Sequence, residues 1–304
     1  MEYQSGAVRP VGNIQDGWAI IKDDYWTFFG MTLVAGVILI IVAVILGVIN
    51  NAITFGISAA LGMATSKGGD AAKLSASLVP QLISMVISLF TNIIVGALSG
   101  VLFCGIYKAL SNKIDSGAAN FGDLFSGFQK FSSCLIVATV VALVQFVLSL
   151  AMLLGSAALG VSVIGSGMIT RDGQLNPALF GGLFLVILAF GIIYIIISLI
   201  IGAMTTFAYP LIGDRDLPGG QALSLSIKAG FANLGGLILM TILLGLMIFG
   251  GLLVCLVGAL FVAPISIAAI FSAYQSVFGR AAGSAYQNTP PPPPTFNNQP
   301  GYGY

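Results

Sequence analysis

Two amide side chains within apolar stretches, Asn92 and Gln145, are the residues of this chain best suited to bind a molecule inside a membrane. A buried amide needs hydrogen-bond partners, because leaving it unpaired in hydrocarbon is energetically costly. A neighbouring helix can supply these partners, and so can a bound neutral molecule. Both interpretations stay open, and the two residues are our first candidates to line an internal path.

A second group with chemical potential lies in the segment from Pro210 to Gly220, which contains Asp214, Arg215 and Asp216. Two carboxylates beside a guanidinium can bind a metal ion or a phosphate. A solvated turn at the membrane surface is the alternative, and it is the interpretation we favour. Together with Asp123 from another predicted cytoplasmic loop, these residues form the candidate ionic cluster.

The sequence contains few other residues that could take part in catalysis. It contains no histidine, the commonest metal ligand and general base. The cysteines Cys104, Cys134 and Cys255 have no CxxC spacing, so we interpret them as packing residues and not as a disulfide framework. We therefore predict no catalytic site, metal site or cofactor, and expect that the protein is not an enzyme. An enzyme would have to use acids of the cytoplasmic loops, namely Asp115, Asp123, Asp214 and Asp216.

Long apolar segments must position these residues. The chain is 58% hydrophobic and 7% charged, with a mean hydropathy of +1.04, which is far from the balance of soluble domains. A helix of about 20 apolar residues crosses a bilayer, so the predicted fold is an all-α, polytopic transmembrane helix bundle. Residues 1–282 form its integral membrane domain. The six predicted spans are residues 28–49, 82–107, 134–159, 180–208, 231–250 and 252–274.

The boundaries between the spans follow from turn-forming and charged residues. The Gly-, Ser- and Lys-rich segment 66–77 is predicted to be a solvent loop, and Gly250-Gly251 to be the turn of the last hairpin. Pro264 indicates a kink, or a broken helix of the transporter type. In the alternative five-span arrangement, the last apolar interval crosses once and folds back. The GxxxG pattern at Gly96 to Gly100 favours close helix packing, within one subunit or in a dimer.

The distribution of basic residues predicts the orientation. Cytoplasmic loops of membrane proteins are enriched in Lys and Arg. Eight of the 11 basic residues fall on the side that holds both termini, which we therefore place in the cytoplasm of a bacterial inner membrane. The other side holds Lys67, Lys73 and Arg171. The net charge of +1 gives no field that would attract nucleic acid.

Short amphipathic segments precede the odd-numbered spans and are predicted to be interfacial helices. Asn13 and Asn120, each followed by an Asp three residues later, are candidate helix caps. Starts near residues 13, 120 and 219 suggest a hairpin unit repeated three times, although a chance coincidence of three such helices remains the alternative. The aromatic residues predicted to anchor them at the headgroups include Trp18, Trp26, Phe125 and Phe128.

A family resemblance is carried by Pro210-Leu211-Ile212, Asp214 to Leu217, Ser226 and Lys228, and by the segment from Asp123 to Phe128. In these segments the chain resembles uncharacterised bacterial integral membrane proteins of about six spans. That group is similar to domain-of-unknown-function membrane families and to the membrane domains fused to some glycerophosphodiester phosphodiesterases. The resemblance implies a bacterial inner-membrane protein and transfers no catalytic residue.

Residues 283–304 contain the unbroken run Pro290 to Pro294 and are predicted to be a disordered, Pro-rich cytoplasmic tail. Such a tail can dock on a protein partner or act only as a solubilising segment. Our first hypothesis is a non-enzymatic membrane scaffold or accessory subunit that contacts membrane lipids, with a protein partner bound through the tail. The alternative is a transporter or channel component for a neutral or lipid-like substrate. The sequence does not indicate the oligomeric state.

Overall fold

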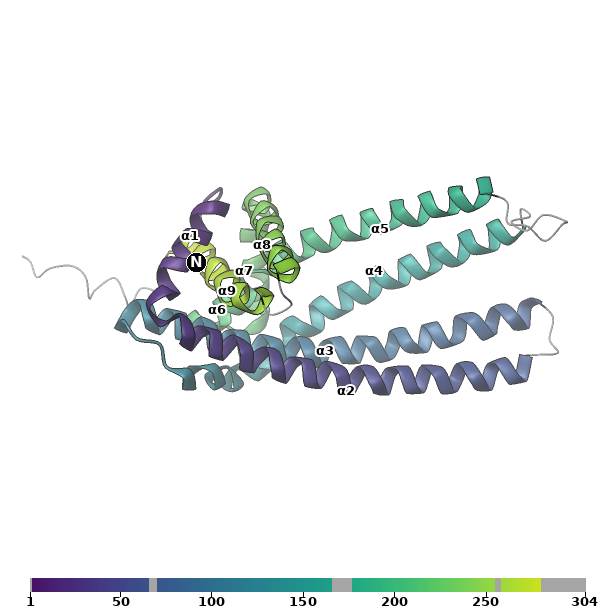
Figure 1. Cartoon of the computed structure of the whole chain (residues 1–304), viewed down its shortest axis with the longest axis horizontal. Coiled ribbons are helices and arrows are strands. Elements are labelled where there is room, and N and C mark those ends of the chain that lie inside the picture. Colours follow the sequence, from purple (N-terminus) through teal and green to yellow (C-terminus); the bar gives the residue numbers. More distant parts are fainter. Residues whose placement is uncertain (1, 66–69, 166–176, 255–257, 280–304) are drawn as a thin grey trace, which may run out of the picture.

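The computed structural model describes residues 2–65, 70–165, 177–254 and 258–279. Every regular element among these residues is helical (Figure 1). In chain order the elements are α1 (Pro10–Ile21), η1 (Lys22–Asp24), α2 (Tyr25–Thr65), α3 (Asp70–Ser116), η2 (Phe121–Lys130), α4 (Phe131–Gly165), α5 (Pro177–Thr205), α6 (Ala208–Arg215), α7 (Gly219–Ala232), α8 (Leu234–Val254) and α9 (Gly258–Phe278).

Six of these helices, α2, α3, α4, α5, α8 and α9, contain stretches that are long and apolar enough to cross a membrane. This confirms the predicted all-α bundle. Helices α2 and α3 have 41 and 47 residues and are longer than the predicted spans. At 1.5 Å per residue they measure about 60 and 70 Å, roughly twice the thickness of the hydrocarbon core.

Several predicted boundaries are wrong. Residues 70–77, predicted to be solvent loop, belong to α3, since their small residues are compatible with a helix. Helix α8 passes through Gly250-Gly251 without a turn and ends at Val254. Gly251 instead lets α8 approach α9 closely, because a Cβ on it would lie 2.8 Å from the backbone carbonyl carbon of Gly258. Pro264 lies within α9, which continues through it.

The helices occur in a pattern that repeats three times. A short helix precedes two long apolar helices in the segments α1 to α3, η2 to α5 and α7 to α9. This element order agrees with the hypothesis of a threefold hairpin repeat. Short helices are present at the three predicted positions as α1, η2 and α7, and η2 is a 3₁₀ helix.

The three short helices also pack in an equivalent way, each against the returning long helix of the preceding repeat. Helix η2 lies on α3, α7 lies on α5, and α1 closes the ring by lying on α9. Each contact is made by a glycine followed by an aromatic residue: Gly17-Trp18, Gly127-Phe128 and Gly230-Phe231. The glycines face the partner backbone, while the three aromatic side chains are exposed.

Only a residue without a Cβ fits at these contacts. A Cβ on Gly17 would lie 2.6 Å from the backbone nitrogen of Ala269, and a Cβ on Gly230 would lie 2.7 Å from the Cα of Met204. A Cβ on Gly127 would overlap the carbonyl oxygen of Val101. Close backbone approach therefore fixes where each short helix sits.

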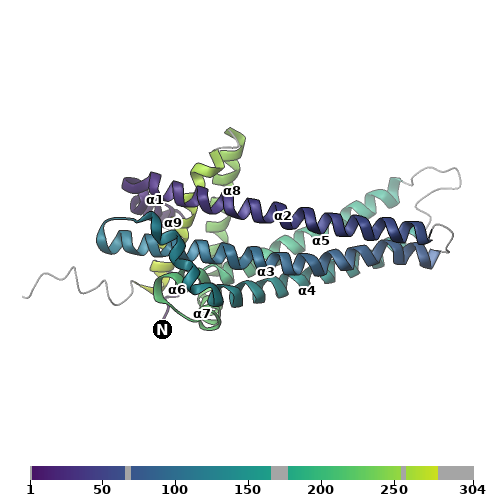
Figure 2. The same ribbon diagram turned by 90° about the horizontal axis from the view of Figure 1, so that it is seen from below.

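We call this packed region the hub: α1, η2, α6 and α7, with the ends of α3, α5 and α9 that they cover. From the hub, α2, α3, α4 and α5 extend in the same general direction, and we call these extensions the arms (Figure 1). Helices α8 and α9 run across the direction of the arms in both views (Figures 1 and 2).

Helix-capping polar residues behave differently in the first two repeats. Asn120 caps η2, since its side chain accepts a hydrogen bond from the Gly122 amide at 2.9 Å, as predicted. The prediction that Asn13 is a cap is wrong, because Pro10 starts α1 one turn earlier and Arg9 takes the capping position. Asn13 is instead fully buried, and its amide nitrogen donates to the hydroxyls of Ser272 and Ser276 on α9. These bonds fasten α1 to the end of α9.

Candidate functional site

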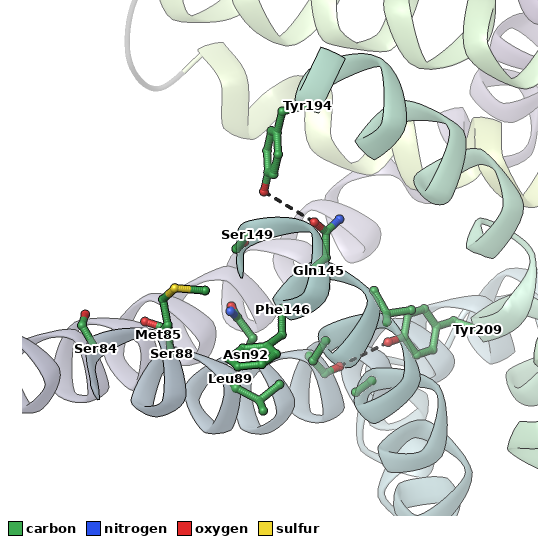
Figure 3. Close-up of a pocket in the computed structure, with 14 residues that line it drawn as sticks. Ser84, Met85, Ser88, Leu89, Asn92, Gln145, Phe146, Ser149, Tyr194 and Tyr209 are labelled. Atoms are coloured by element: carbon green, nitrogen blue, oxygen red, sulfur yellow. Dashed lines mark hydrogen bonds between the residues drawn. The ribbon is translucent and has the colours of Figure 1, made fainter. Parts of the chain in front are cut away.

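A half-open cavity of about 500 Å³ lies between α3, α4 and α5, with α6 at one end (Figure 3). It brings together Asn92 from α3 and Gln145 from α4, the two residues that the sequence analysis nominated for an internal path. None of the side chains that line it is charged. Seven of them are apolar, and the polar ones are Ser84, Ser88, Asn92, Gln145, Ser149, Tyr194 and Tyr209.

Helical spacing explains why these groups share one face. Ser84, Ser88 and Asn92 are four residues apart along α3, and Gln145 and Ser149 are four apart along α4, so each set forms a stripe. The stripes face each other because α3 and α4 approach closely at Gly96, where a Cβ would lie 3.2 Å from the Cβ of Ala138. Gly100 packs beneath the ring of Tyr209. The GxxxG pattern therefore serves packing within one subunit.

Hydrogen bonds hold part of the polar lining. The Tyr194 hydroxyl of α5 donates to the side-chain oxygen of Gln145 at 3.4 Å (Figure 3). The Tyr209 hydroxyl donates to the Gly96 carbonyl at 3.4 Å. Asn50 of α2 lies behind the α3 stripe and donates to Ser88 at 3.2 Å, while Ser84 donates to its oxygen at 3.4 Å.

Other polar groups of the lining have no protein partner within the part of the chain that the structure describes. The Asn92 side chain makes no hydrogen bond there, and the Gln145 amide nitrogen makes none either. Asn92 is exposed to the cavity. In a low-dielectric setting, such groups favour an occupant that can accept and donate hydrogen bonds.

The cavity lies far from the basic end of the bundle. From Lys108 to Asn92, and likewise from Lys130 to Gln145, the helices rise by more than about 20 Å at 1.5 Å per residue. This separation is about two thirds of the thickness of a hydrocarbon core, which is about 30 Å. A second cavity of about 460 Å³ shares Ser84 and Met85 and continues along the arms past Thr54, Ser58 and Gln81.

The candidate ionic cluster is divided by the structure. Its two buried charges, Asp214 and Arg215, lie in α6, and the segment predicted to be a loop is therefore helical from Ala208 to Arg215. The favoured interpretation as a solvated turn is wrong for these two residues, whose side chains are 7% and 11% exposed. Asp216 follows in a left-handed conformation, is 65% exposed and pairs with Lys130 at 2.8 Å.

Three consecutive residues at the end of α3 each connect to an aspartate of a different element, namely α6, η2 and η1. Ser111 donates to Asp214 at 2.6 Å, Asn112 donates to Asp123 at 2.9 Å, and Lys113 pairs with Asp24 at 2.6 Å. Asp123 and Asp214 are thus bound to adjacent residues of α3. The three aspartates therefore connect elements of the hub to one another.

Further bonds complete the connection between α6 and α9. Tyr274 donates to Asp214 at 2.6 Å, and the Arg215 guanidinium donates to the carbonyls of Phe278 and Gly279 at 2.8 and 2.7 Å. In the described residues, His, Cys, Asp and Glu side chains form no group of three or more that could hold a metal ion.

The predicted anchors are exposed, as a headgroup-facing aromatic residue should be. Exposed fractions are 45% for Trp18, 70% for Trp26 and 48% each for Phe125 and Phe128. Trp26 belongs to an aromatic cluster with Tyr25, Phe29 and Phe261, in which the Tyr25 hydroxyl donates to the Phe261 carbonyl at 2.8 Å. Cys104 and Cys134 are buried, as predicted for packing residues. Cys255 and the tail at 283–304 lie outside the described residues.

The sequence analysis missed the serines and Asn50 as members of the site. The four-residue spacing of Ser84, Ser88 and Asn92 was the available signal. No sequence signal was available for Tyr209, because its place in the lining depends on how α6 folds back onto α3. Comparison of the chain with protein-family models, curated proteins and solved structures gives no significant match, so the site is interpreted from its geometry alone.

Proposed function

We propose that the protein is a multi-pass membrane protein that binds a neutral, amphipathic, lipid-like molecule between α3, α4 and α5, and that it works as a transporter or channel component without catalysing a reaction. The observation that carries the proposal is the uncharged, amide- and hydroxyl-lined cavity around Asn92 and Gln145. A charged headgroup would find no counter-ion among the lining residues, and leaving it unpaired within the apolar part of the membrane would be costly.

The mixed lining suits a molecule with two chemically different parts. Amides and hydroxyls can exchange hydrogen bonds with a hydroxyl-bearing headgroup, while Leu89, Val141 and Phe146 offer apolar contact to a hydrocarbon chain. The volume of about 500 Å³ is in the range of small-molecule sites. A headgroup and the first part of an acyl chain fit such a space, and the remaining chain can stay in the bilayer.

Binding can be tested with the full-length protein in lipid nanodiscs and a fluorescent diacylglycerol, which has a neutral hydroxyl headgroup. We expect saturable binding that weakens about tenfold in Gln145→Leu and in Asn92→Leu, since each removes hydrogen bonds to the ligand that together contribute about 1.4 kcal/mol. Asn51→Leu is the matched control, because Asn51 is an exposed amide of α2 whose side chain bonds only its own helix at Gly47.

A fluorescent phosphatidylglycerol, which carries a negative charge, distinguishes a neutral site from a general lipid surface. The proposal predicts that it binds at least tenfold more weakly than the diacylglycerol. Equal binding of both probes, or binding of the diacylglycerol that neither substitution changes, would refute it.

For localisation, we propose a bacterial inner membrane with both termini in the cytoplasm. The excess of Lys and Arg on that side supports the orientation, and the family resemblance supports the source. The N-terminal segment meets the end of α9 through the bond from the Gln4 amide to the Val277 carbonyl at 2.8 Å, so the two ends of the membrane domain lie together. Cysteines introduced at Ser75 and Ser284 test the orientation: the first should react with an impermeant maleimide from outside, and the second only after the cells are opened.

The exposed aromatic residues of the hub support a second candidate function, a scaffold or accessory subunit that contacts headgroups and a protein partner. Trp18, Phe125 and Phe128 project from short helices and do not contribute to the cavity. This candidate predicts that Trp18→Ser with Phe125→Ser, or a chain ending at Gly283, loses a co-purifying partner while diacylglycerol binding persists. Unchanged recovery of partners in both variants would exclude it.

A further inference from the structure

Two buried thiols face each other across the α3–α4 interface. The Sγ atoms of Cys104 and Cys134 are 3.5 Å apart, and both residues are at most 1% exposed. The Cys104 sulfur also lies 3.4 Å from the carbonyl oxygen of Tyr209. Disulfide formation requires the sulfurs to approach to about 2 Å, so a shift of about 1.5 Å is needed. A modest rotation of the two side chains can supply such a shift.

The surrounding helices keep this pair aligned. The close approach at Gly96 and Ala138 lies one helical turn beyond Cys134 on α4, so the two backbones are held near each other on the cavity side. On the other side, Gly213 of α6 packs directly against Cys104, since a Cβ there would lie 2.7 Å from the Cys104 carbonyl oxygen. Neither helix can move the thiols apart without disturbing the hub.

A small pocket reaches one of the two cysteine residues. The pocket has a volume of about 140 Å³, and its lining includes Cys104, Lys108, Lys130 and Asp216. Cys104 is therefore the thiol that meets an oxidant first, and Cys134 is placed to react with it next.

We propose that Cys104 and Cys134 are an oxidation-sensitive thiol pair that forms a reversible disulfide when a peroxide enters this pocket. In the first step the Cys104 thiolate attacks one peroxide oxygen and the O–O bond breaks, giving a sulfenic acid and, after proton uptake, water. In the second step the Cys134 sulfur attacks the sulfenic sulfur, and its thiol proton leaves with the hydroxyl group as a second water. The two thiols supply the two electrons that reduce the peroxide.

The resulting bond would join α3 to α4 between the hub and the cavity, and would fix the separation of these helices. The inference does not depend on what occupies the cavity, because the chemistry involves only the pair and the small pocket.

The test uses the full-length chain in membrane vesicles with Cys255→Ser, so that two thiols remain. After treatment with hydrogen peroxide, the protein is denatured and labelled with a mass-tagged maleimide. We expect two labels before oxidation, none afterwards in a monomeric band, and two again after dithiothreitol. Cys104→Ser should keep one label under the same mild treatment.

A matched control moves one thiol to another face of α4. In Ser132→Cys with Cys134→Ser, the new cysteine is exposed and lies two residues from the native position. This variant should keep both labels where the native pair loses both. The proposal is overturned if the native pair keeps its labels under conditions that oxidise an added dithiol peptide. It is also overturned if the labels are lost without recovery by dithiothreitol, or if oxidation produces only dimers.

Discussion

The hub and the arms of this protein are stabilised by different means. In the most apolar stretch of α9, whose end belongs to the hub, 56% of the residues are buried, whereas none is buried in that of α5. The hub combines backbone contacts at Gly17, Gly127 and Gly230 with buried charges. The arms carry Ile, Leu, Val and Phe side chains that face outward, as in a lipid environment.

The difference shows where this fold can tolerate a site with open polar groups. In the hub, polar and charged groups such as Asn13, Asp214 and Asp123 bond to other protein groups. Between the arms, amides and hydroxyls are left open to a cavity. Specific contacts fix the end of the bundle, and the looser helices beyond it provide space for a ligand.

The strongest test of this comparison replaces a glycine in each region. Gly17→Val should destabilise the folded protein by about 3 kcal/mol or prevent it from folding, because the new side chain collides with the α9 backbone. Gly36→Val on α2 meets no atom within 4 Å and should leave the thermal midpoint nearly unchanged. Size-exclusion chromatography and thermal unfolding in detergent would measure both. Equal effects would show that the hub is not the rigid part.

A smaller effect is expected from neutralising the buried carboxylate of the hub. Asp214→Asn removes the charge that Ser111, Tyr274 and Arg215 surround, at a cost of about 2 kcal/mol. The matched variant Asp216→Asn changes an exposed carboxylate and should cost less than about 1 kcal/mol. Thermal unfolding of both variants in the same detergent would measure the two losses of stability. A larger loss for Asp216→Asn would contradict this description of α6.

In the arms, loss of a polar group should affect ligand binding more than stability. Gln145→Leu removes one long hydrogen bond to Tyr194, so the unfolding free energy should change by less than about 1 kcal/mol. Diacylglycerol binding should fall about tenfold in the same preparation. If stability falls with binding, Gln145 is a structural contact between α4 and α5 and not a ligand contact.

The smallest effect concerns pH. The hydrogen bond from Lys113 holds the pKa of Asp24 below its ordinary value of 3.8. The folded state therefore binds this proton less readily than the unfolded state, and the pair contributes stability above that value. The contribution is lost as the pH falls through the lowered pKa. Thermal midpoints measured from neutral pH to below 3.8 should decline less steeply in Asp24→Asn than in the unchanged chain.

Much of the fold could be predicted from sequence, because apolar length and helical spacing are local properties. Six apolar helices, three short amphipathic helices and the Asn120 cap follow from patterns within single segments. The boundary errors at residues 70–77, at Gly250-Gly251 and at Pro210 to Arg215 share a cause. Gly and polar residues were interpreted as turn formers, but packing or a favourable helix environment keeps them helical.

The candidate site could likewise be predicted from the sequence only in part. The composition determined that Asn92 and Gln145 are costly to bury and therefore informative, and that the protein belongs in a membrane. Only the tertiary structure placed them in one cavity, closed a ring by laying α1 on α9, and buried Asp214 against Ser111 and Tyr274. Those outcomes depend on the contacts between helices distant in sequence, where glycine backbones and single hydrogen bonds select one arrangement, and no local pattern encodes that selection.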